Sequence, residues 1–393
     1  MNEHFRHKRK SAESQLERAG NSLTQPFVRR LHGDAREVPV APLGADLVVT
    51  SPPYWKKRDY GLAGQIGQES TPDAYVSHLL DCMENWQKVL PEWGSIFINI
   101  GDTYYRGSLA GIPARLEVAA ENAGWKLRNR IIWVKQAGVP DPAKDRLKNR
   151  HEYVFHFVRS KTYYYDQFGY AEKYGNGANP TDVWTIGLRR DTSDHLAPYP
   201  IELVDRILTL ACPREVCVCC GEPRRRIVRR TAELDVVRPQ AKRAMELAKE
   251  KGLTAAHIAA IQATGISDAG KAMRIQTGTG RNSESVKRLA AEAKAALGGY
   301  FREFTFAKRV TDGWTTCNCQ QFRPGIVLDP FMGTGTTLRA AHLAGRSGIG
   351  IDLAQEFADK KDSAGGDRSI RGARVRARGR ATGDKKRSKS SHS

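Results

Sequence analysis

The sequence contains no apolar run of the roughly 20 residues that a helix needs to cross a bilayer. Its N-terminal segment is polar and basic, and it lacks the apolar core that a secretion signal carries. We therefore expect neither a membrane span nor a signal peptide. Cysteine is scarce as well, with seven in 393 residues. In a chain of this kind, so few cysteines favour free thiols or metal ligands over disulfides.

Acidic residues are in deficit, with 43 Asp and Glu against 63 Lys and Arg, which gives a formal net charge of +20. The isoelectric point is near 9.7. Such an excess predicts a polyanionic partner, and nucleic acid is the simplest one. Basic tails on a neutral enzyme would explain part of the charge. The hydrophobic content of 40% suffices for a sizeable core, and the length suggests several domains or one large domain with an insertion.

One stretch, residues 46–55, reads DLVVTSPPYW. Its apolar and β-branched residues predict a short buried strand, which Pro52 and Pro53 end because proline fixes φ and has no N–H. The resulting platform presents the hydroxyl of Ser51, backbone carbonyls and the ring of Tyr54. Carbonyls can hold an exocyclic amine, and an aromatic face can stack on a flipped-out base. A proline-rich turn with a packed tyrosine is the simpler alternative.

A second stretch, residues 325–337, reads GIVLDPFMGTGTT. It predicts a strand, a tight turn at Gly333 and Gly335, and the start of a helix. A further strand at 347–352 ends in Asp352, about 20 residues on, where ribose hydroxyls are usually held. A strand, a glycine turn and a helix N-terminus form a cradle for a nucleotide-type cofactor in a doubly wound sheet.

Together the two stretches resemble the amino-methylating DNA methyltransferases. In that family a Thr/Ser-Pro-Pro-Tyr loop is catalytic, and an Asp-Pro-Phe-x-Gly-x-Gly-Thr loop holds S-adenosylmethionine. Here the catalytic loop precedes the cofactor loop, which resembles the permuted, beta-class order. The resemblance covers most of residues 30–220 and 320–357, but neither the insert nor either tail. It implies an α/β fold with a Rossmann-like, circularly permuted methyltransferase sheet.

The resemblance also implies a set of site residues. The catalytic loop would comprise Ser51, Pro52, Pro53 and Tyr54. The cofactor contacts would be Asp34, Pro200, Asp329, Phe331, Gly333, Gly335, Thr336 and Asp352. For Asp34 and Pro200, ordinary roles in a turn and at a helix start remain open.

Five of the seven cysteines fall in two clusters. Cys217 and Cys220 have C-x-x-C spacing, and Cys317 and Cys319 supply two more thiols about a hundred residues later. Four thiolates satisfy a closed structural zinc site, which has no open position for catalysis. Cys219 is a rival ligand, and reduced, partly buried cysteines are the alternative.

These features divide the chain into five parts. We expect a basic disordered N-terminus (1–22), the first part of the catalytic domain (23–216), a zinc-clasped and mainly helical insert (217–319), the cofactor-loop part of the catalytic domain (320–360), and a basic disordered tail (361–393). Helices are expected at 71–90, 112–123, 201–210, 241–251, 254–264 and 283–297, with another beginning at 265, and further strands at 95–100, 130–135 and 153–158. The helices of the insert have the rhythm of helix–turn–helix units that read DNA, although many inert helical pairs share it.

The resemblance implies a site-specific DNA methyltransferase that acts on an exocyclic amine. The serine that heads Ser-Pro-Pro-Tyr resembles the cytosine-N4 members, with adenine N6 as the main alternative. The Pro-Cys nucleophile of cytosine-C5 enzymes is absent, since Cys212 and Pro213 stand in the reverse order. Other hypotheses are a DNA-binding protein with an inactive methyltransferase fold, and an RNA or protein methyltransferase.

The expected partner is double-stranded DNA, and a cognate restriction endonuclease outside this chain is possible. We expect no membrane partner. The resemblance implies a cytoplasmic, nucleoid-associated protein of bacterial or phage origin, and the oligomeric state is left open.

Overall fold

The computed structural model describes residues 24–38, 44–136, 143–175, 180–187, 199–264, 282–298 and 302–359. The predictions for residues 1–22, for residues 361–393 and for the helix beginning at 265 lie outside these ranges. In the described ranges, no helix combines the length and the apolar character that crossing a membrane requires.

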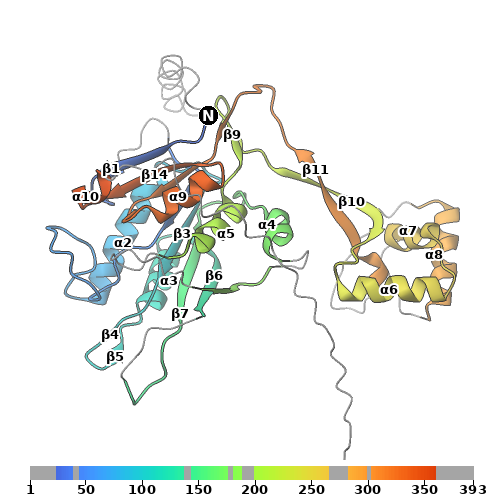
Figure 1. The fold of residues 1–393 in the computed structure, drawn as a ribbon, viewed down its shortest axis with the longest axis horizontal. Coiled ribbons are helices and arrows are strands. Elements are labelled where there is room, and N and C mark those ends of the chain that lie inside the picture. Colours follow the sequence, from blue (N-terminus) through green and yellow to red (C-terminus); the bar gives the residue numbers. More distant parts are fainter. Residues whose placement is uncertain are drawn as a thin grey trace, which may run out of the picture. The chain divides into compact units, whose positions relative to one another are not determined.

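The described part of the chain is organised around an eight-stranded sheet with the order β1-β14-β13-β2-β3-β7-β6-β8 (Figure 1). Its strands are β1 (Val28–His32), β2 (Leu47–Thr50), β3 (Ser95–Ile100), β6 (Lys126–Lys135), β7 (His151–Val158), β8 (Val183–Ile186), β13 (Ile326–Asp329) and β14 (Ser347–Asp352). The neighbours from β1 to β3 are parallel, and β7 runs antiparallel to both β3 and β6. The α/β fold built on a large, mainly parallel sheet, which the sequence predicts, is therefore confirmed, and the antiparallel strand β7 is an addition to that prediction.

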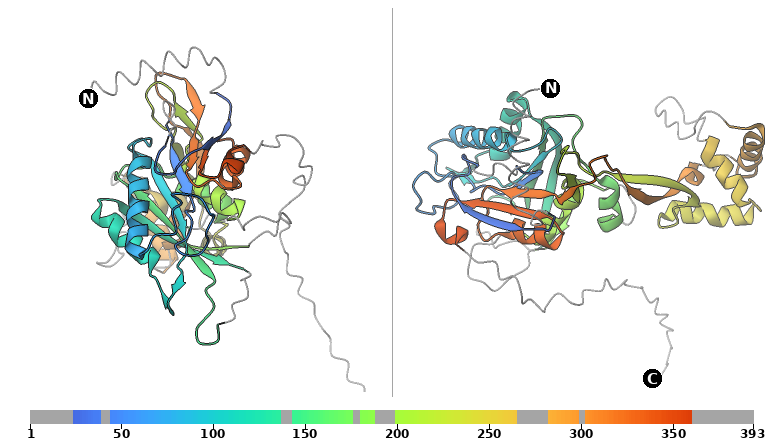
Figure 2. Two further views of the ribbon diagram at one scale, coloured as in Figure 1. Left: turned by 90° about the vertical axis from the view of Figure 1, so that its left-hand side faces the viewer. Right: turned by 90° about the horizontal axis from the view of Figure 1, so that it is seen from above.

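Helices cover both faces of this sheet (Figure 2). One face packs against α2 (Pro72–Gln87) and α3 (Ile112–Asn122), and the other against α4 (Gln167–Tyr174), α5 (Ile201–Ala211) and α9 (Thr336–Leu343). Strand β2 contributes to the cores on both faces. Val48 packs in the core under α2 and α3, and Leu47 and Val49 pack in the core under α4, α5 and α9. Successive side chains of a strand point to opposite faces, so a doubly covered strand is apolar throughout.

Local sequence sets the ends of the helices. Thr71 caps α2 by accepting a hydrogen bond from the Ala74 amide at 3.2 Å, and Pro72 occupies the first turn. The aromatic and apolar stripe that follows is buried at Tyr75, Leu79, Met83 and Trp86. Its interpretation as core is thus confirmed.

Between β9 (Glu215–Cys217) and its partner β12 (Phe322–Pro324) the chain forms an insert. A two-stranded antiparallel ribbon, β10 (Arg226–Leu234) with β11 (Ala307–Trp314), leads to the helices α6 (Pro239–Glu250), α7 (Ala255–Thr264) and α8 (Glu284–Ala296), which lie close to the short 3-10 helix η1 (Arg302–Thr305). The helices share a small core of their own that includes Ala244, Ile261 and Phe304. Three of the four helices predicted for the insert are present, and the fourth, beginning at 265, lies outside the described residues. The ribbon was not predicted, because Arg226, Arg229 and Arg230 make the sequence of β10 read as a basic run.

Candidate active site

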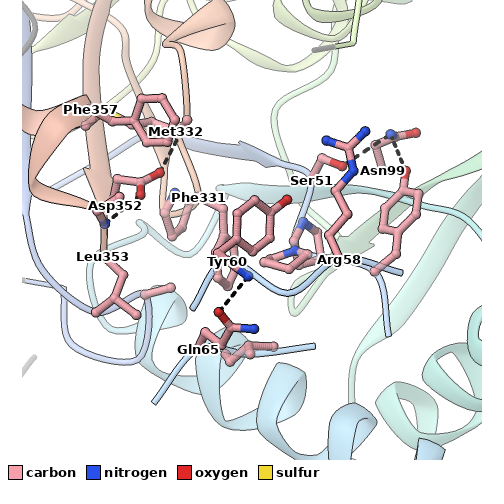
Figure 3. A pocket seen from close by; sticks show the side chains of 18 of the residues that line it. Ser51, Arg58, Tyr60, Gln65, Asn99, Phe331, Met332, Asp352, Leu353 and Phe357 are labelled. Carbon is pink, nitrogen blue, oxygen red and sulfur yellow. Dashed lines mark hydrogen bonds between the residues drawn. The ribbon is translucent and has the colours of Figure 1, made fainter. Parts of the chain in front are cut away.

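A cavity of about 410 Å³ opens at the carboxyl ends of β2, β13 and β14 (Figure 3). This is the edge where ligands bind in open α/β sheets. One part of its lining comes from residues 51–54, here called the SPPY loop, and from β3, β6 and β7. These lining residues are Ser51, Pro52, Pro53, Tyr54, Asn99, Trp133, Lys135 and Glu152. Another part comes from the glycine turn and the end of β14: Phe331, Met332, Gly333, Thr336, Asp352 and Phe357. The two stretches singled out in the sequence therefore face one cavity.

The structure brings most of the expected site residues together there. The lining includes Asp34, Ser51, Pro52, Pro53, Tyr54, Phe331, Gly333, Thr336 and Asp352. The other three, Pro200, Asp329 and Gly335, stand outside the lining. Pro200 is the N-cap residue of α5, and its neighbour Tyr199 lines the cavity in its place.

The hydroxyl of Tyr54 belongs to a buried polar network. It donates to Glu152 Oε2 at 2.7 Å and accepts from Asn99 Nδ2 at 3.0 Å. Asn99 Nδ2 also lies 2.8 Å from Glu152 Oε2 and 3.4 Å from Ser51 Oγ. The ammonium of Lys135 pairs with the other oxygen of Glu152 at 2.5 Å. The network ties the SPPY loop to three strands of the sheet.

Charge and burial compete at Glu152. Burial alone would raise its pKa, but the charge of Lys135 and the hydrogen bonds from Lys135, Tyr54 and Asn99 outweigh it and lower the pKa. The carboxylate is therefore ionised at neutral pH. Burial raises the pKa of Tyr54 well above its usual value, so its phenol keeps its proton and acts as the donor.

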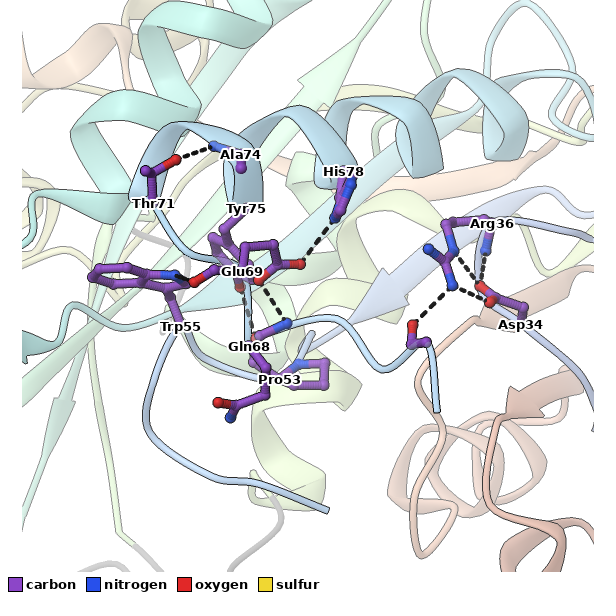
Figure 4. Close-up of polar contacts among 12 residues, drawn as sticks. Asp34, Arg36, Pro53, Trp55, Gln68, Glu69, Thr71, Ala74, Tyr75 and His78 are labelled. Carbon is purple, nitrogen blue, oxygen red and sulfur yellow. Dashed lines mark hydrogen bonds and ion pairs between the residues drawn. The ribbon is translucent and has the colours of Figure 1, made fainter. Parts of the chain in front are cut away.

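The backbone of the SPPY loop is held from α2 and the segment before it (Figure 4). Tyr75 Oη donates to the Pro53 carbonyl at 2.8 Å, and the Trp55 indole donates to the Glu69 carbonyl at 2.9 Å. The Tyr54 ring packs on Gly101, where an added Cβ would lie 2.9 Å from ring atom Cε2. The loop is thus preorganised, and the Pro53 carbonyl already has a donor.

The glycine turn forms the other side of the cavity. Gly333 has φ of 49° and space around the position of a Cβ, and its amide donates to Asp352 Oδ2 at 2.8 Å. The other carboxylate oxygen of Asp352 accepts from the Ala354 amide at 2.9 Å. Burial raises the pKa of Asp352 despite these bonds. An anchored carboxylate of this kind keeps lone pairs for the hydroxyls of a ribose.

Gly335 meets a different need. Its φ is 88°, it precedes α9, and an added Cβ would lie 2.4 Å from Arg30 Nη2. Close approach of another protein segment therefore accounts for this glycine.

Asp329 lies behind the turn and is 1% exposed. Its carboxylate accepts from Thr50 Oγ1 at 2.7 Å, Tyr199 Oη at 2.9 Å and Thr337 Oγ1 at 2.5 Å. Burial raises its pKa above the usual value. The residue joins the end of β2 to the glycine turn and α9, and so supports the cavity wall from behind.

Asp34 lines the cavity with its carboxylate already paired. Arg36 donates to it through its backbone amide at 2.9 Å and through its guanidinium, which also reaches the Gly64 carbonyl at 2.8 Å (Figure 4). The hydrogen bond from the Arg36 side chain holds the pKa of Asp34 below its usual value.

Sequence reasoning missed several lining residues, above all Asn99, Lys135 and Glu152. Two were within reach. Lys135 ends the expected strand 130–135, and Glu152 immediately precedes the expected strand 153–158. Antiparallel pairing of these two strands would bring the two residues close together. In the observed register, Glu152 pairs with Trp133, two residues before Lys135.

The two cysteine clusters meet beside the β9–β12 pair. The sulfur atoms of Cys217, Cys220, Cys317 and Cys319 all lie within 4.8 Å of one another. Cys219 lies apart from this group, and its Sγ is 3.8 Å from Gln321 Oε1.

A doubly covered, mostly parallel sheet with a glycine turn and a terminal aspartate at one cavity is the arrangement found in α/β proteins that bind nucleotide-type cofactors. The family model N6_N4_Mtase, described as DNA methylase, matches residues 45–218 and 318–362. The chain belongs to this DNA methylase family.

Two curated relatives are each similar to less than half of this chain. The type II methyltransferase M.SmaI of Serratia marcescens is 35% identical over 204 residues, which cover 43% of this chain and 70% of the relative. M.Cfr9I of Citrobacter freundii is 33% identical over 188 residues, which cover 40% of this chain and 63% of the relative, so the match spans less than two thirds of that enzyme. A solved PvuII DNA methyltransferase (cytosine-N4-specific) aligns with 87% of this chain and 91% of its own at 14% identity, with a TM-score of 0.43.

Proposed function

We propose that this chain transfers a methyl group from S-adenosylmethionine to an exocyclic amine of a base flipped out of double-stranded DNA. The observation that carries the proposal is the single cavity shared by the SPPY loop and the glycine turn. Family membership and the relatives described as type II methyltransferases support it. The permuted order of the two loops belongs to the same proposal, as does a cytoplasmic location.

The residues around Gly333 and Asp352 suit a nucleoside cofactor. The turn lets a ligand approach the backbone at Gly333, Asp352 offers an acceptor for ribose hydroxyls, and Phe331 and Phe357 supply aromatic surface. S-adenosylmethionine, when bound there, supplies an electrophilic methyl group. The chain's own contribution is to hold cofactor and amine in line, which lowers the entropic part of the barrier.

The residues at the other side suit a planar base with an amine. Its lone pair is conjugated into the ring and is weakly nucleophilic. The Ser51 hydroxyl and the Pro52 carbonyl would accept the amine hydrogens and favour the tetrahedral form that attacks, while Tyr54 would stack on the ring. Asn99 and Lys135 place donors on the cavity wall, and the Watson–Crick edge of cytosine offers two acceptors, N3 and O2, where that of adenine offers one, N1. With Ser51 at the head of the loop, this favours cytosine N4 over adenine N6.

We also propose a structural zinc ion at Cys217, Cys220, Cys317 and Cys319. With zinc–sulfur bonds of about 2.3 Å, the sulfurs of a tetrahedral site lie roughly 3.8 Å apart, which agrees with the observed cluster within 4.8 Å. The ion would join the two ends of the insert, and Arg323 of the adjoining β12 is already paired with Asp46 at the start of β2, at 2.6 Å.

Methyl transfer to DNA is the test. The purified chain is incubated with isotopically labelled S-adenosylmethionine and unmethylated bacterial DNA, and label is expected in DNA but not in RNA or protein. Single-molecule sequencing of DNA from a methylation-free host that expresses the chain then identifies base and site. Label in RNA or protein alone, or no label with correctly folded, cofactor-binding protein, would overturn the proposal.

A further inference from the structure

A short hairpin beside the candidate active site presents large side chains to solvent. Its strands are β4 (Tyr104–Tyr105) and β5 (Ser108–Leu109), with Tyr104 opposite Leu109. Tyr104 is 40% exposed, Tyr105 38% and Leu109 47%. Exposed apolar side chains that gather in one place mark interaction sites more often than single ones do.

The turn of the hairpin has an unusual residue at its tip. Arg106 and Gly107 both have positive φ, 50° and 79°, as a two-residue type I′ turn requires. Glycine and asparagine adopt this conformation more readily than arginine. The chain therefore bears a conformational cost to place a cation at the tip, and such costs concentrate at functional sites.

The hairpin is anchored next to the SPPY loop. It leaves the end of β3, where Asp102 accepts hydrogen bonds from the amides of Thr103 at 2.8 Å and Ile112 at 3.1 Å. The Tyr105 ring lies 5.0 Å from the ring of Trp55, the residue after Tyr54, in an edge-to-face contact. Its position relative to the candidate catalytic loop is thus fixed by direct contact.

Basic residues flank the hairpin. The guanidinium carbon of Arg146 lies 3.8 Å from the centroid of the Tyr104 ring. Its segment, residues 143–150, has four basic residues against one acidic residue, and it carries Leu147, which is 92% exposed. Across the Trp55 contact, the SPPY loop continues into Lys56, Lys57 and Arg58. Aromatic and apolar side chains between cations suit a duplex, whose stacked bases lie between phosphates.

We propose that residues 104–109 form a wedge that enters duplex DNA beside the target base pair, with Tyr104 and Leu109 filling the space that the extruded base leaves. This inference rests on the proposed function and extends it to the step before chemistry. Extrusion costs unstacking and unpairing energy, and side chains inserted into the stack offset part of that cost. Arg106 and Arg146 would contact the flanking phosphates.

The test compares two duplexes that carry the site mapped by sequencing. In one the target base is paired, and in the other it is mispaired and therefore easier to extrude. Single-turnover methyl transfer is measured for the parent chain, for a double variant with Tyr104→Ser and Leu109→Ser, and for the control Val118→Ser, whose side chain is 58% exposed on α3. The double variant should lose about tenfold or more on the paired duplex and stay within about twofold of the parent on the mispaired one. The control should match the parent on both.

The possible results distinguish a failure of the wedge proposal from a failure of the proposed methyl-transfer activity. Equal losses on both duplexes, or no loss on the paired one, would overturn the wedge while the parent's transfer upholds the proposed function. A parent chain that methylates neither duplex would overturn the proposed function and the wedge with it. Unchanged melting temperature and cofactor affinity in the double variant exclude misfolding as the cause of a loss.

Discussion

Tyr54 and Glu152, which lie 98 residues apart in the chain, are joined by a hydrogen bond of 2.7 Å from phenol to carboxylate. The bond ties the aromatic residue of the SPPY loop to the antiparallel strand of the sheet. The bond helps to fix the position of the ring, which packs on Gly101 immediately after β3.

Tyr54→Phe should therefore reduce stability and activity by more than removal of a hydroxyl from a ring that serves only for stacking. The variant keeps the ring but removes a donor from a buried carboxylate, which destabilises the fold by about 1–3 kcal/mol. We expect methyl transfer to fall by about tenfold, the equivalent of roughly 1.4 kcal/mol. Thermal unfolding and single-turnover transfer measure the two effects.

A second variant separates ring position from ring chemistry. Gly101→Ala leaves Tyr54 intact and places a methyl group 2.9 Å from ring atom Cε2, so the ring has to shift. Both variants should slow transfer without changing the affinity for S-adenosylmethionine. Parent rates in both would show that the ring need not be held in place.

Lys135→Met should make the activity acid-sensitive. Burial raises the pKa of Glu152 and Lys135 is the strongest influence against it, so its removal lets the pKa rise. In the parent the depressed pKa contributes stability that is complete above the unfolded-state pKa and is lost as pH falls through the lower folded-state pKa. In the variant, activity and stability should decline at a higher pH than in the parent.

A pH series of transfer rate and melting temperature, from about pH 5 to 8, checks this. Lys126→Met is the matched control, because Lys126 lies at the other end of β6 and donates to the Arg159 carbonyl at 2.7 Å. Superimposable pH profiles for parent and Lys135→Met would contradict the expectation.

Ser51→Ala should affect the chemical step more than binding. Its hydroxyl accepts from the amine most strongly as the nitrogen becomes tetrahedral, so its loss is felt in the transition state. We expect single-turnover transfer to fall by about ten- to a hundredfold while equilibrium DNA affinity changes less than about threefold. A change in DNA affinity as large as the change in rate would make Ser51 a binding residue only.

Gly333→Ala tests the approach of a cofactor to the backbone. Space is open around its Cβ position, so the added methyl group meets no protein atom within 4 Å. Gly345, after α9, is the matched control, since it too has positive φ and open space. Both alanines bear a similar conformational cost, about 1 kcal/mol. Only Gly333→Ala should weaken S-adenosylmethionine binding in calorimetry, by tenfold or more, and equal affinities in the two variants would place the cofactor elsewhere.

Features determined by residues close together in the chain could be predicted from the sequence, whereas features that depend on contacts between distant segments could not. The strand ended by Pro52 and Pro53, the glycine turn and the stripe of α2 were predictable because residues a few positions apart determine them. These local patterns predicted six of the eight strands and the two sides of the cavity, but not β1, β8 or the helix α4.

The polar network was not predictable in the same way. Asn99, Lys135 and Glu152 meet Tyr54 only because β7 pairs antiparallel with both β3 and β6, and strand order is a property of the whole sheet. Similarly, Asp329 is drawn behind the cavity wall by Thr50 and Tyr199, which come from two distant segments. In the basic ribbon of the insert, β10 pairs with β11 across a long intervening segment, so no local sequence pattern predicts this pairing.

Chelation or Cys317→Ser should release the proposed zinc ion and loosen the insert. The expected metal content of freshly purified protein is about one equivalent. Cys219→Ser is the matched control, since Cys219 lies in the same knuckle but outside the sulfur cluster. We expect Cys317→Ser to lose the metal and to melt at a lower temperature, because structural zinc sites contribute directly to folding stability. Cys219→Ser should retain both. Protein prepared without chelators that holds no zinc, or equal metal loss in the two variants, would show that the four thiols are not a zinc site.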